Sequence, residues 1–142
     1  MGVAIVTQIF PIPADVLWGM IGDFGDTGKW SGRPPEACIC DGDGIGALRT
    51  LTLADGRVIV DRLEAQGEYY YSYSIVTSPL PVRSYRAMMT VAPLTDYSSV
   101  FTWSGNIEPE GLTDEQAVAF FEDIYRMGIG LINRSIAGNI AE

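Results

Sequence analysis

The sequence contains no histidine, and this absence excludes more chemistry than any other feature of its composition. Histidine is the usual general acid or base near neutral pH and the commonest side-chain ligand of transition metals. Without it, serine–histidine triads, histidine acid–base catalysis and nearly every common transition-metal site are ruled out. Any chemistry must therefore come from Asp, Glu, Tyr, Arg, Lys or Cys side chains.

Basic residues and long apolar runs are also scarce. Nine Lys and Arg stand against 18 Asp and Glu, and the resulting net charge of −9 repels phosphate backbones and anionic membranes. No apolar run approaches the roughly 20 residues of a membrane span, and the N-terminus lacks the basic-then-apolar order of a signal peptide. We therefore expect a cytoplasmic protein that neither binds nucleic acid nor spans a membrane.

Cysteine is nearly absent as well. Cys38 and Cys40 are two residues apart on one predicted strand, so they share a face. They are too close in sequence for a disulfide between them to cross-link distant parts of the fold. No histidine is available to lower the pKa of either thiol, so we expect reduced, structural cysteines rather than nucleophiles. Four loop carboxylates lack the spacing of an EF-hand, and we expect no metal there: Asp23, Asp26, Asp41 and Asp43.

The residues that are present predict one folded domain over residues 1–142. Apolar residues make up 47% of the chain and charged residues 19%, a balance that excludes disorder. A helix is predicted over residues 14–21, with a short helix or turn around Lys29 and Trp30. Apolar and β-branched runs between Gly, Pro and Asp turns predict seven strands, over residues 3–10, 36–41, 47–53, 57–64, 68–76, 83–91 and 98–107.

Residues 113–137 predict the only long amphipathic helix. The segment opens with Thr113-Asp114-Glu115-Gln116, a capping-box pattern, and apolar residues then recur at helical spacing. Gly138 follows, and we expect it to end the helix. One long helix with many antiparallel strands predicts an α+β fold in which the sheet curls around that helix.

Short motifs in this order resemble a known family. They are Ala14-Asp15-Val16-Leu17-Trp18, Gly22-Asp23-Phe24, Trp30, Gly46-Ala47-Leu48-Arg49, Asp61-Arg62-Leu63-Glu64, Tyr71 with Tyr73, Pro79-Leu80-Pro81, Tyr85, Trp103 and Glu108-Pro109-Glu110-Gly111. Together they resemble the START/Bet v 1-like (SRPBCC) superfamily, and most closely its polyketide cyclase/dehydrase and lipid-transport-like members. The resemblance covers almost the whole chain. It implies a helix-grip fold, in which a seven-stranded antiparallel sheet wraps the C-terminal helix and leaves a deep apolar cavity.

The chain departs from the family pattern at two places. Asp61 stands where the family usually has Glu. The hairpin at Ala54-Asp55-Gly56 is shorter than the gating loop of the hormone receptors in the superfamily, which argues against a receptor-type gate. Since the same superfamily contains receptors, cyclases, allergens and carriers, the fold alone does not settle the function.

Period-two alternation assigns strand faces once Asp61 is taken as inward, by resemblance. The inward residues are then Ile59 and Leu63; Arg49, Leu51 and Leu53; Tyr71, Tyr73 and Ile75; and Tyr85, Ala87, Met89 and Val91. On the last strand we expect Val100, Thr102, Ser104 and Asn106 to face inward, with Phe101 and Trp103 on the other face. The helix contributes Phe121, Ile124, Tyr125, Gly128 and Ile132.

The polar residues among these have two interpretations each. Asp61 is either a general acid/base with a pKa raised by burial or the partner of Arg49 in a structural ion pair. Arg49 could polarise a ligand carbonyl or bind a carboxylate. Tyr73 and Tyr85 could orient or protonate an enolate, or simply form apolar wall with a satisfied hydroxyl. Trp30 either contacts a ligand as part of a lid or packs in the core.

The sequence therefore predicts a protein that binds a hydrophobic, aromatic or polyketide-like small molecule without a cofactor. If it is an enzyme, we expect cyclisation, dehydration or a related proton transfer, with Asp61, Arg49 and Tyr85 as catalytic residues. The alternative is a non-catalytic carrier or sensor, and either could be a monomer or a homodimer. The predicted ligand contacts are Trp30, Leu51, Ile59, Tyr71, Tyr73, Ala87, Met89, Thr102, Ser104, Asn106, Phe121, Tyr125 and Gly128.

Overall fold

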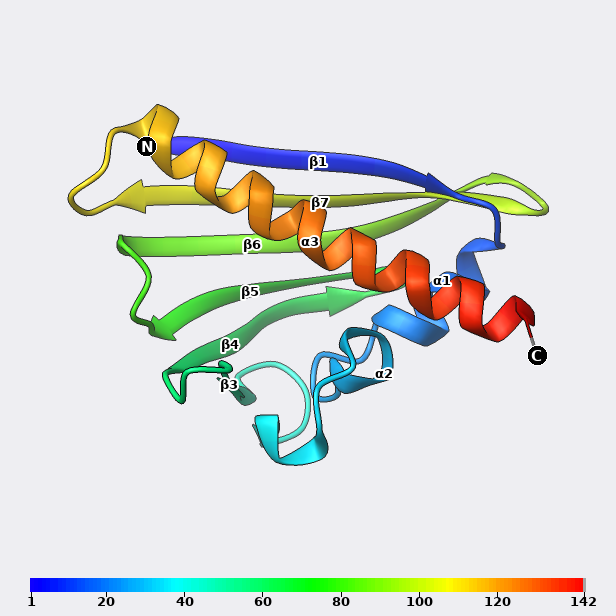
Figure 1. Ribbon diagram of the computed structural model, residues 1–142, viewed down its shortest axis with the longest axis horizontal. Helices are drawn as coiled ribbons and strands as arrows, with labels where there is room; N and C mark the ends of the chain where they lie inside the picture. Colours follow the sequence, from blue (N-terminus) through cyan, green and yellow to red (C-terminus); the bar gives the residue numbers. More distant parts are fainter. Residues whose placement is uncertain (142) are drawn as a thin grey trace.

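A seven-stranded antiparallel sheet and one long helix form the molecule (Figure 1). The computed structural model describes residues 1–141, with side chains as far as residue 138. The elements are β1 (Gly2–Phe10), α1 (Ala14–Ile21), α2 (Gly28–Ser31), the short 3-10 turn η1 (Pro35–Ala37), β2 (Cys38–Asp41), β3 (Leu48–Thr52), β4 (Val58–Gly67), β5 (Tyr70–Thr77), β6 (Val82–Thr95), β7 (Ser98–Pro109) and α3 (Asp114–Ala141). This arrangement confirms the predicted helix-grip α+β fold.

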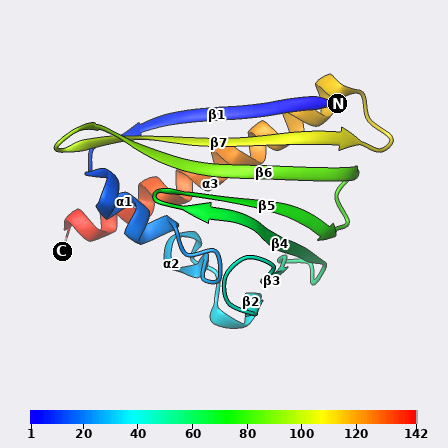
Figure 2. The same ribbon diagram turned by 180° about the vertical axis from the view of Figure 1, so that it is seen from behind.

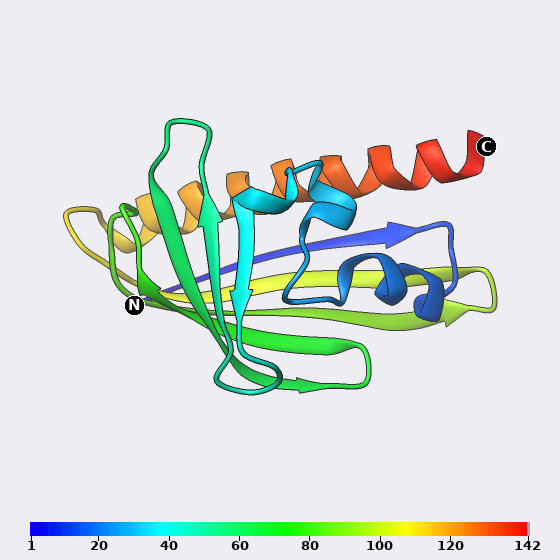
Figure 3. The same cartoon turned by 90° about the horizontal axis from the view of Figure 1, so that it is seen from below.

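The sheet runs in the order β1-β7-β6-β5-β4-β3-β2, so β2 to β7 form a meander and β1 adds to its far edge. The helix α3 lies along one face of the sheet (Figures 1 and 2). The helix α2 packs against α3, whereas α1 packs against β6 and β7. Two register shifts between β4 and β5 increase the local twist. In Figure 3 the β3–β4 hairpin rises from the sheet to the level of α3, so the sheet curls around the helix.

The start of α3 is as predicted, but its end is not. The N–H of Thr113 donates to Gln116 Oε1 at 3.0 Å, and the N–H of Gln116 donates to Thr113 Oγ1 at 3.1 Å, which completes the capping box. The helix then passes through Gly138 and continues to Ala141, so the expected stop is wrong. A glycine ends a helix when it takes the left-handed conformation, and Gly138 is not among the glycines with positive φ.

Boundaries elsewhere also differ from the predictions. The first residues of the second predicted strand form η1 instead, because Pro34 and Pro35 lead into a tight turn before β2. The turn between β4 and β5 falls on Glu68 and Tyr69, and Tyr69 itself adopts a left-handed φ of 64°. Gly67, which lies between the strands predicted over residues 57–64 and 68–76, belongs to β4.

The predicted face of β7 is wrong. Phe101, Trp103 and Ile107 are buried, whereas Val100, Thr102 and Ser104 are only partly covered and Asn106 is exposed. The register explains the difference, because directly opposed residues of an antiparallel pair lie on the same face. Three inward residues of β6 oppose odd-numbered residues of β7: Ala87 opposes Gly105, Met89 opposes Trp103 and Val91 opposes Phe101.

Candidate functional site

A cavity of about 320 Å³ lies between the sheet and α3. Its walls come from the inward positions of β3 to β7, from one face of α3, and from α2 with the loop that follows it. Of the lining residues, Met127 is 72% exposed and others, such as Leu80 and Ile124, are half-buried, so the cavity reaches the surface of the protein. The lining residues are Thr27, Trp30, Ser31, Arg33, Arg49, Leu51, Leu53, Ile59, Asp61, Tyr71, Tyr73, Ile75, Leu80, Tyr85, Met89, Trp103, Phe121, Ile124, Tyr125, Met127, Gly128 and Leu131.

The structure brings most of the predicted site residues into this one wall. They are Trp30, Arg49, Leu51, Ile59, Asp61, Tyr71, Tyr73, Tyr85, Met89, Phe121, Tyr125 and Gly128. Ala87 is buried on the correct face but lies in the core rather than in the wall. Thr102, Ser104 and Asn106 are on the opposite face of β7, so these three predicted ligand contacts are misplaced.

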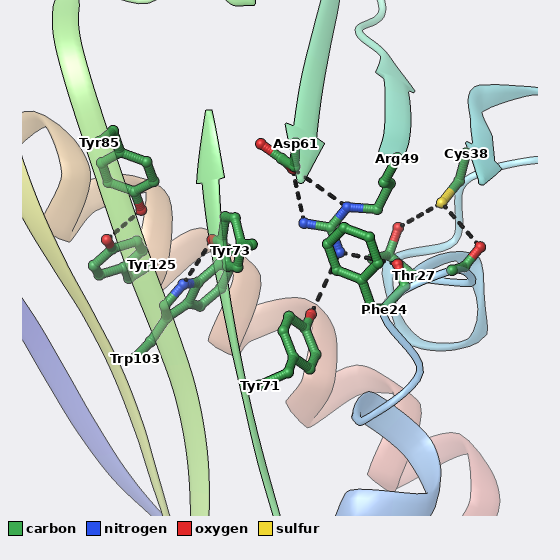
Figure 4. Close-up of polar contacts among 11 residues, drawn as sticks. Phe24, Thr27, Cys38, Arg49, Asp61, Tyr71, Tyr73, Tyr85, Trp103 and Tyr125 are labelled. Atoms are coloured by element: carbon green, nitrogen blue, oxygen red, sulfur yellow. Dashed lines mark hydrogen bonds and ion pairs between the residues drawn. The ribbon is translucent and has the colours of Figure 1, made fainter. Parts of the chain in front are cut away.

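Arg49 and Asp61 form a buried ion pair at the centre of the site (Figure 4). They are directly opposed on β3 and β4, and each is 3% exposed. Arg49 donates to Asp61 Oδ2 from Nη2 at 2.8 Å and from Nε at 3.3 Å. Its Nη1 donates to the Phe24 carbonyl at 3.1 Å and to the Tyr71 hydroxyl at 3.4 Å. The guanidinium is therefore held by groups from β4, from β5 and from the loop that follows α1.

Aromatic rings complete the surroundings of Arg49. Its guanidinium carbon lies 4.2 Å from the centre of the Phe24 ring and 5.0 Å from that of Tyr73, distances at which a cation and a ring attract. Burial raises the pKa of the Asp61 carboxyl, and the guanidinium of Arg49 opposes that rise. Both hydrogen bonds from Arg49 end on Oδ2, which leaves Oδ1 as the oxygen of Asp61 that neither bond occupies.

A second polar group consists of tyrosine hydroxyls. Tyr85 and Tyr125 are hydrogen-bonded through their hydroxyls, and Trp103 Nε1 donates to the Tyr73 hydroxyl at 3.1 Å (Figure 4). Burial raises the pKa of Tyr73 and of Tyr85 well above the usual value. Both phenols are therefore neutral at physiological pH, and they can donate hydrogen bonds but cannot act as tyrosinate bases.

Two glycines make room for this aromatic wall. Trp103 stacks on Tyr125 with ring centres 4.7 Å apart, which requires close approach of β7 to α3. A Cβ atom at Gly128 would lie only 2.6 Å from Trp103 Cζ3, and one at Gly105 would collide with the hydroxyl of Tyr125. Gly128 therefore has a packing reason for its place in the predicted site.

Trp30 belongs to the wall and to the core at once. It is 7% exposed, and its ring lies edge-on to Trp103 with centres 6.3 Å apart. Thr27, one turn earlier, donates to Cys38 Sγ at 3.4 Å, and this contact ties the segment around α2 to β2 (Figure 4). The two interpretations of Trp30, ligand contact and core packing, are thus compatible.

Sequence reasoning missed Arg33 and Thr27, which also line the cavity. Both lie in the segment around α2, where no strand alternation assigns a direction to side chains. One signal was available for Arg33: it is one of only nine basic residues, and it lies between Trp30 and the pair Pro34-Pro35.

In the described residues, no group of three or more acidic or cysteine side chains is placed to hold a metal ion. No helix in the same residues is both long and apolar enough to cross a membrane.

The family model for polyketide cyclase / dehydrase and lipid transport proteins matches residues 2–135. The chain belongs to this family. None of the curated proteins compared with the chain matches it. The family and the cavity together support a general role in binding small hydrophobic molecules.

Solved structures of other proteins share this family fold. The protein XoxI from Bacillus cereus is 28% identical, with a TM-score of 0.83 and 95% of each chain covered. A protein from Bacillus thuringiensis is 25% identical, with a TM-score of 0.83, covering 94% of this chain and 98% of that one. A Thermobifida fusca protein at 21% identity, with a TM-score of 0.81 over 93% of this chain and 91% of that one, shares the fold.

Proposed function

We propose that this protein binds an aromatic or polyketide-like small molecule in the cavity beneath α3. The observation that carries the proposal is the make-up of the wall, which is apolar and aromatic apart from a few fixed polar groups such as Arg49 and Asp61. Such a combination is typical of small-molecule sites, in which apolar surface supplies affinity and a few polar groups set orientation. The free thiols of Cys38 and Cys40 support a reducing, cytoplasmic location.

The size and lining of the cavity favour a compact ring system. A volume of about 320 Å³ lies at the lower end of the roughly 300–1,000 Å³ of ligand pockets. Several wall residues are aromatic and already interact as ring pairs, among them Tyr85 stacked on Phe121 with centres 4.4 Å apart. A planar ligand can extend these pairs by offset or edge-on contacts.

A second candidate function is cofactor-free cyclisation or dehydration, in which the same site moves a proton. The supporting observation is that Asp61, Arg49 and Tyr85 line one cavity and are all buried. Asp61 Oδ1 would take a proton from the carbon next to a ligand carbonyl, and the electron pair left behind would form an enolate. Arg49 and neutral Tyr85 would donate hydrogen bonds to the enolate oxygen. In a dehydration, the C–O bond of a β-hydroxyl then breaks as the enolate re-forms the carbonyl, and protonated Asp61 gives its proton to the departing hydroxyl, which leaves as water. In a cyclisation, the enolate carbon instead bonds to a second carbonyl carbon of the ligand, and protonated Asp61 gives its proton to the alkoxide that results.

Native mass spectrometry of the purified protein, with its denatured organic extract, tests the binding function. We expect a co-purifying small molecule, or a thermal shift with members of an aromatic and polyketide-like library. Arg49→Ala should abolish the signal, whereas Arg57→Ala in the exposed β3–β4 hairpin should not. An empty protein with no shift across the library would count against the proposal.

Asp61→Asn then separates an enzyme from a carrier. In an enzyme, turnover of the bound compound should collapse while binding is retained, because the amide cannot accept the proton. Asp123→Asn on the exposed surface of α3 is the control and should leave turnover intact. Binding without any turnover in the wild type would favour the non-catalytic carrier.

A further inference from the structure

Two residues of the cavity wall each have a buried donor without a hydrogen-bond partner within the described residues. The donors are the indole Nε1 of Trp30 and the guanidinium Nη1 of Arg33, and both residues line the cavity. A buried donor without an acceptor is destabilising, and folded proteins satisfy nearly all of them. Two such donors on neighbouring residues of one wall therefore point to an acceptor that the protein itself does not provide.

The charges of the lining residues also indicate that a negatively charged acceptor is missing. Arg33, Arg49 and Asp61 all line the cavity, so two guanidinium groups and one carboxylate leave one positive charge in excess. Asp61 is paired with Arg49, and the ion pairs formed by the described residues do not include Arg33. Burial lowers the pKa of Arg33, but an arginine remains protonated in proteins at neutral pH. The excess charge is thus permanent.

Arg33 is also held in place by its backbone. Gly32 follows α2 with a φ of 75°, and Arg33 then donates from its own N–H to Ser31 Oγ at 3.3 Å. The Arg33 carbonyl packs so closely on Gly28 that a Cβ atom there would lie 2.8 Å from it. The segment that carries both donors is therefore a tightly packed part of the wall.

We propose that the ligand carries a carboxylate, which accepts hydrogen bonds from Arg33 and Trp30 while its aromatic part fills the cavity. This inference rests on the proposed function, since it names the chemistry of the same ligand. A carboxylate supplies both the missing acceptors and the missing negative charge. A phosphate dianion fits less well, because it brings more charge than the single excess positive charge can balance.

Isothermal titration calorimetry at pH 7 with matched aromatic probes tests this inference. The probes are benzoate, 2-naphthoate and anthracene-2-carboxylate, each compared with the methyl ketone that has the same ring system. We expect at least one acid to bind about tenfold or more tightly than its ketone. Arg33→Met should weaken binding of that acid about 10- to 100-fold and leave the ketone within about twofold, because it removes a charge-assisted hydrogen bond. Trp30→Phe should weaken binding of the same acid by a smaller factor.

Arg62→Met is the matched control, since it removes the same charge from the exposed face of β4 beside Asp61. It should leave the preference for the acid unchanged. The unfolding free energy of Arg33→Met without ligand should equal or exceed that of the wild type, because the variant removes an unsatisfied donor. A merely structural arginine would instead destabilise the fold when replaced.

The outcomes separate this inference from the proposed function. If ketones bind as tightly as acids, or if Arg33→Met still prefers the acid to the ketone, the proposal of a carboxylate ligand is overturned. The proposal that the cavity binds a small molecule then still stands. If neither acids nor ketones bind and no compound co-purifies, both the cavity function and the carboxylate are overturned.

Discussion

Single residues decide how the polar centre of the cavity is stabilised. Removing one partner of the buried Arg49–Asp61 pair leaves an uncompensated charge, so Arg49→Met should lower the unfolding free energy by about 3–5 kcal/mol. Arg49→Met with Asp61→Leu should recover most of that loss, since no charge then remains buried. Urea unfolding at pH 7 measures both. Arg57→Met, at the exposed pair with Asp55, should leave the unfolding free energy nearly unchanged. A double variant no more stable than the single one would contradict this account.

The buried tyrosines predict an alkaline limit to stability. The pKa of Tyr73 and of Tyr85 is raised well above 10 in the folded protein, whereas an unfolded chain ionises near 10. The unfolded state therefore loses these protons first, so their contribution to stability is complete below pH 10 and is lost as pH rises through the folded pKa. In a tyrosinate absorbance titration, we expect Tyr73 and Tyr85 to ionise only with unfolding. Ionisation of all seven tyrosines near pH 10 in a folded protein would refute this.

At the scale of elements, Gly128 is one of the two glycines that allow α3 and β7 to approach closely. Gly128→Ala places a Cβ atom against the ring of Trp103, so we expect a loss of about 1–3 kcal/mol from overpacking. Gly130→Ala is the matched control on the same helix, where a Cβ atom meets nothing within 4 Å. That change should stabilise the protein by roughly 0.4–1 kcal/mol, because alanine restricts the unfolded chain. Thermal or urea unfolding of the two variants should give opposite signs, and equal signs would contradict the packing argument.

The strands of the sheet also show which features can be read from sequence. Turn residues and apolar periodicity were sufficient to predict seven strands, and the resemblance gave the inward face of β4 and its neighbours. On β7 the same rule failed, because alternation fixes a face only after one residue is anchored, and a slip of one position reverses every side chain. The register with β6 supplies that anchor, by placing Trp103 opposite Met89. The larger apolar residues at 101 and 103 were the available signal.

At the scale of the whole molecule, the fold was predictable and much of the site followed from it. Arg49 and Asp61 come together because neighbouring strands carry them at opposed positions, which alternation can anticipate. The place of Arg33 in the cavity wall cannot be predicted from the alternation of residues along a strand. It depends on the left-handed turn at Gly32 and on packing against Gly28. Positions of that kind depend on loop conformation, which local patterns of hydrophobicity do not specify.

The placement of the tryptophans has a practical consequence for work with the protein. Two of the three, Trp30 and Trp103, are part of the cavity wall, and they are in edge-on contact with each other. A ring that enters the cavity must change the polarity around at least one of these indoles, and therefore its emission. The molecule carries an intrinsic fluorescent reporter of its own occupancy, so candidate compounds can be ranked in solution without a label.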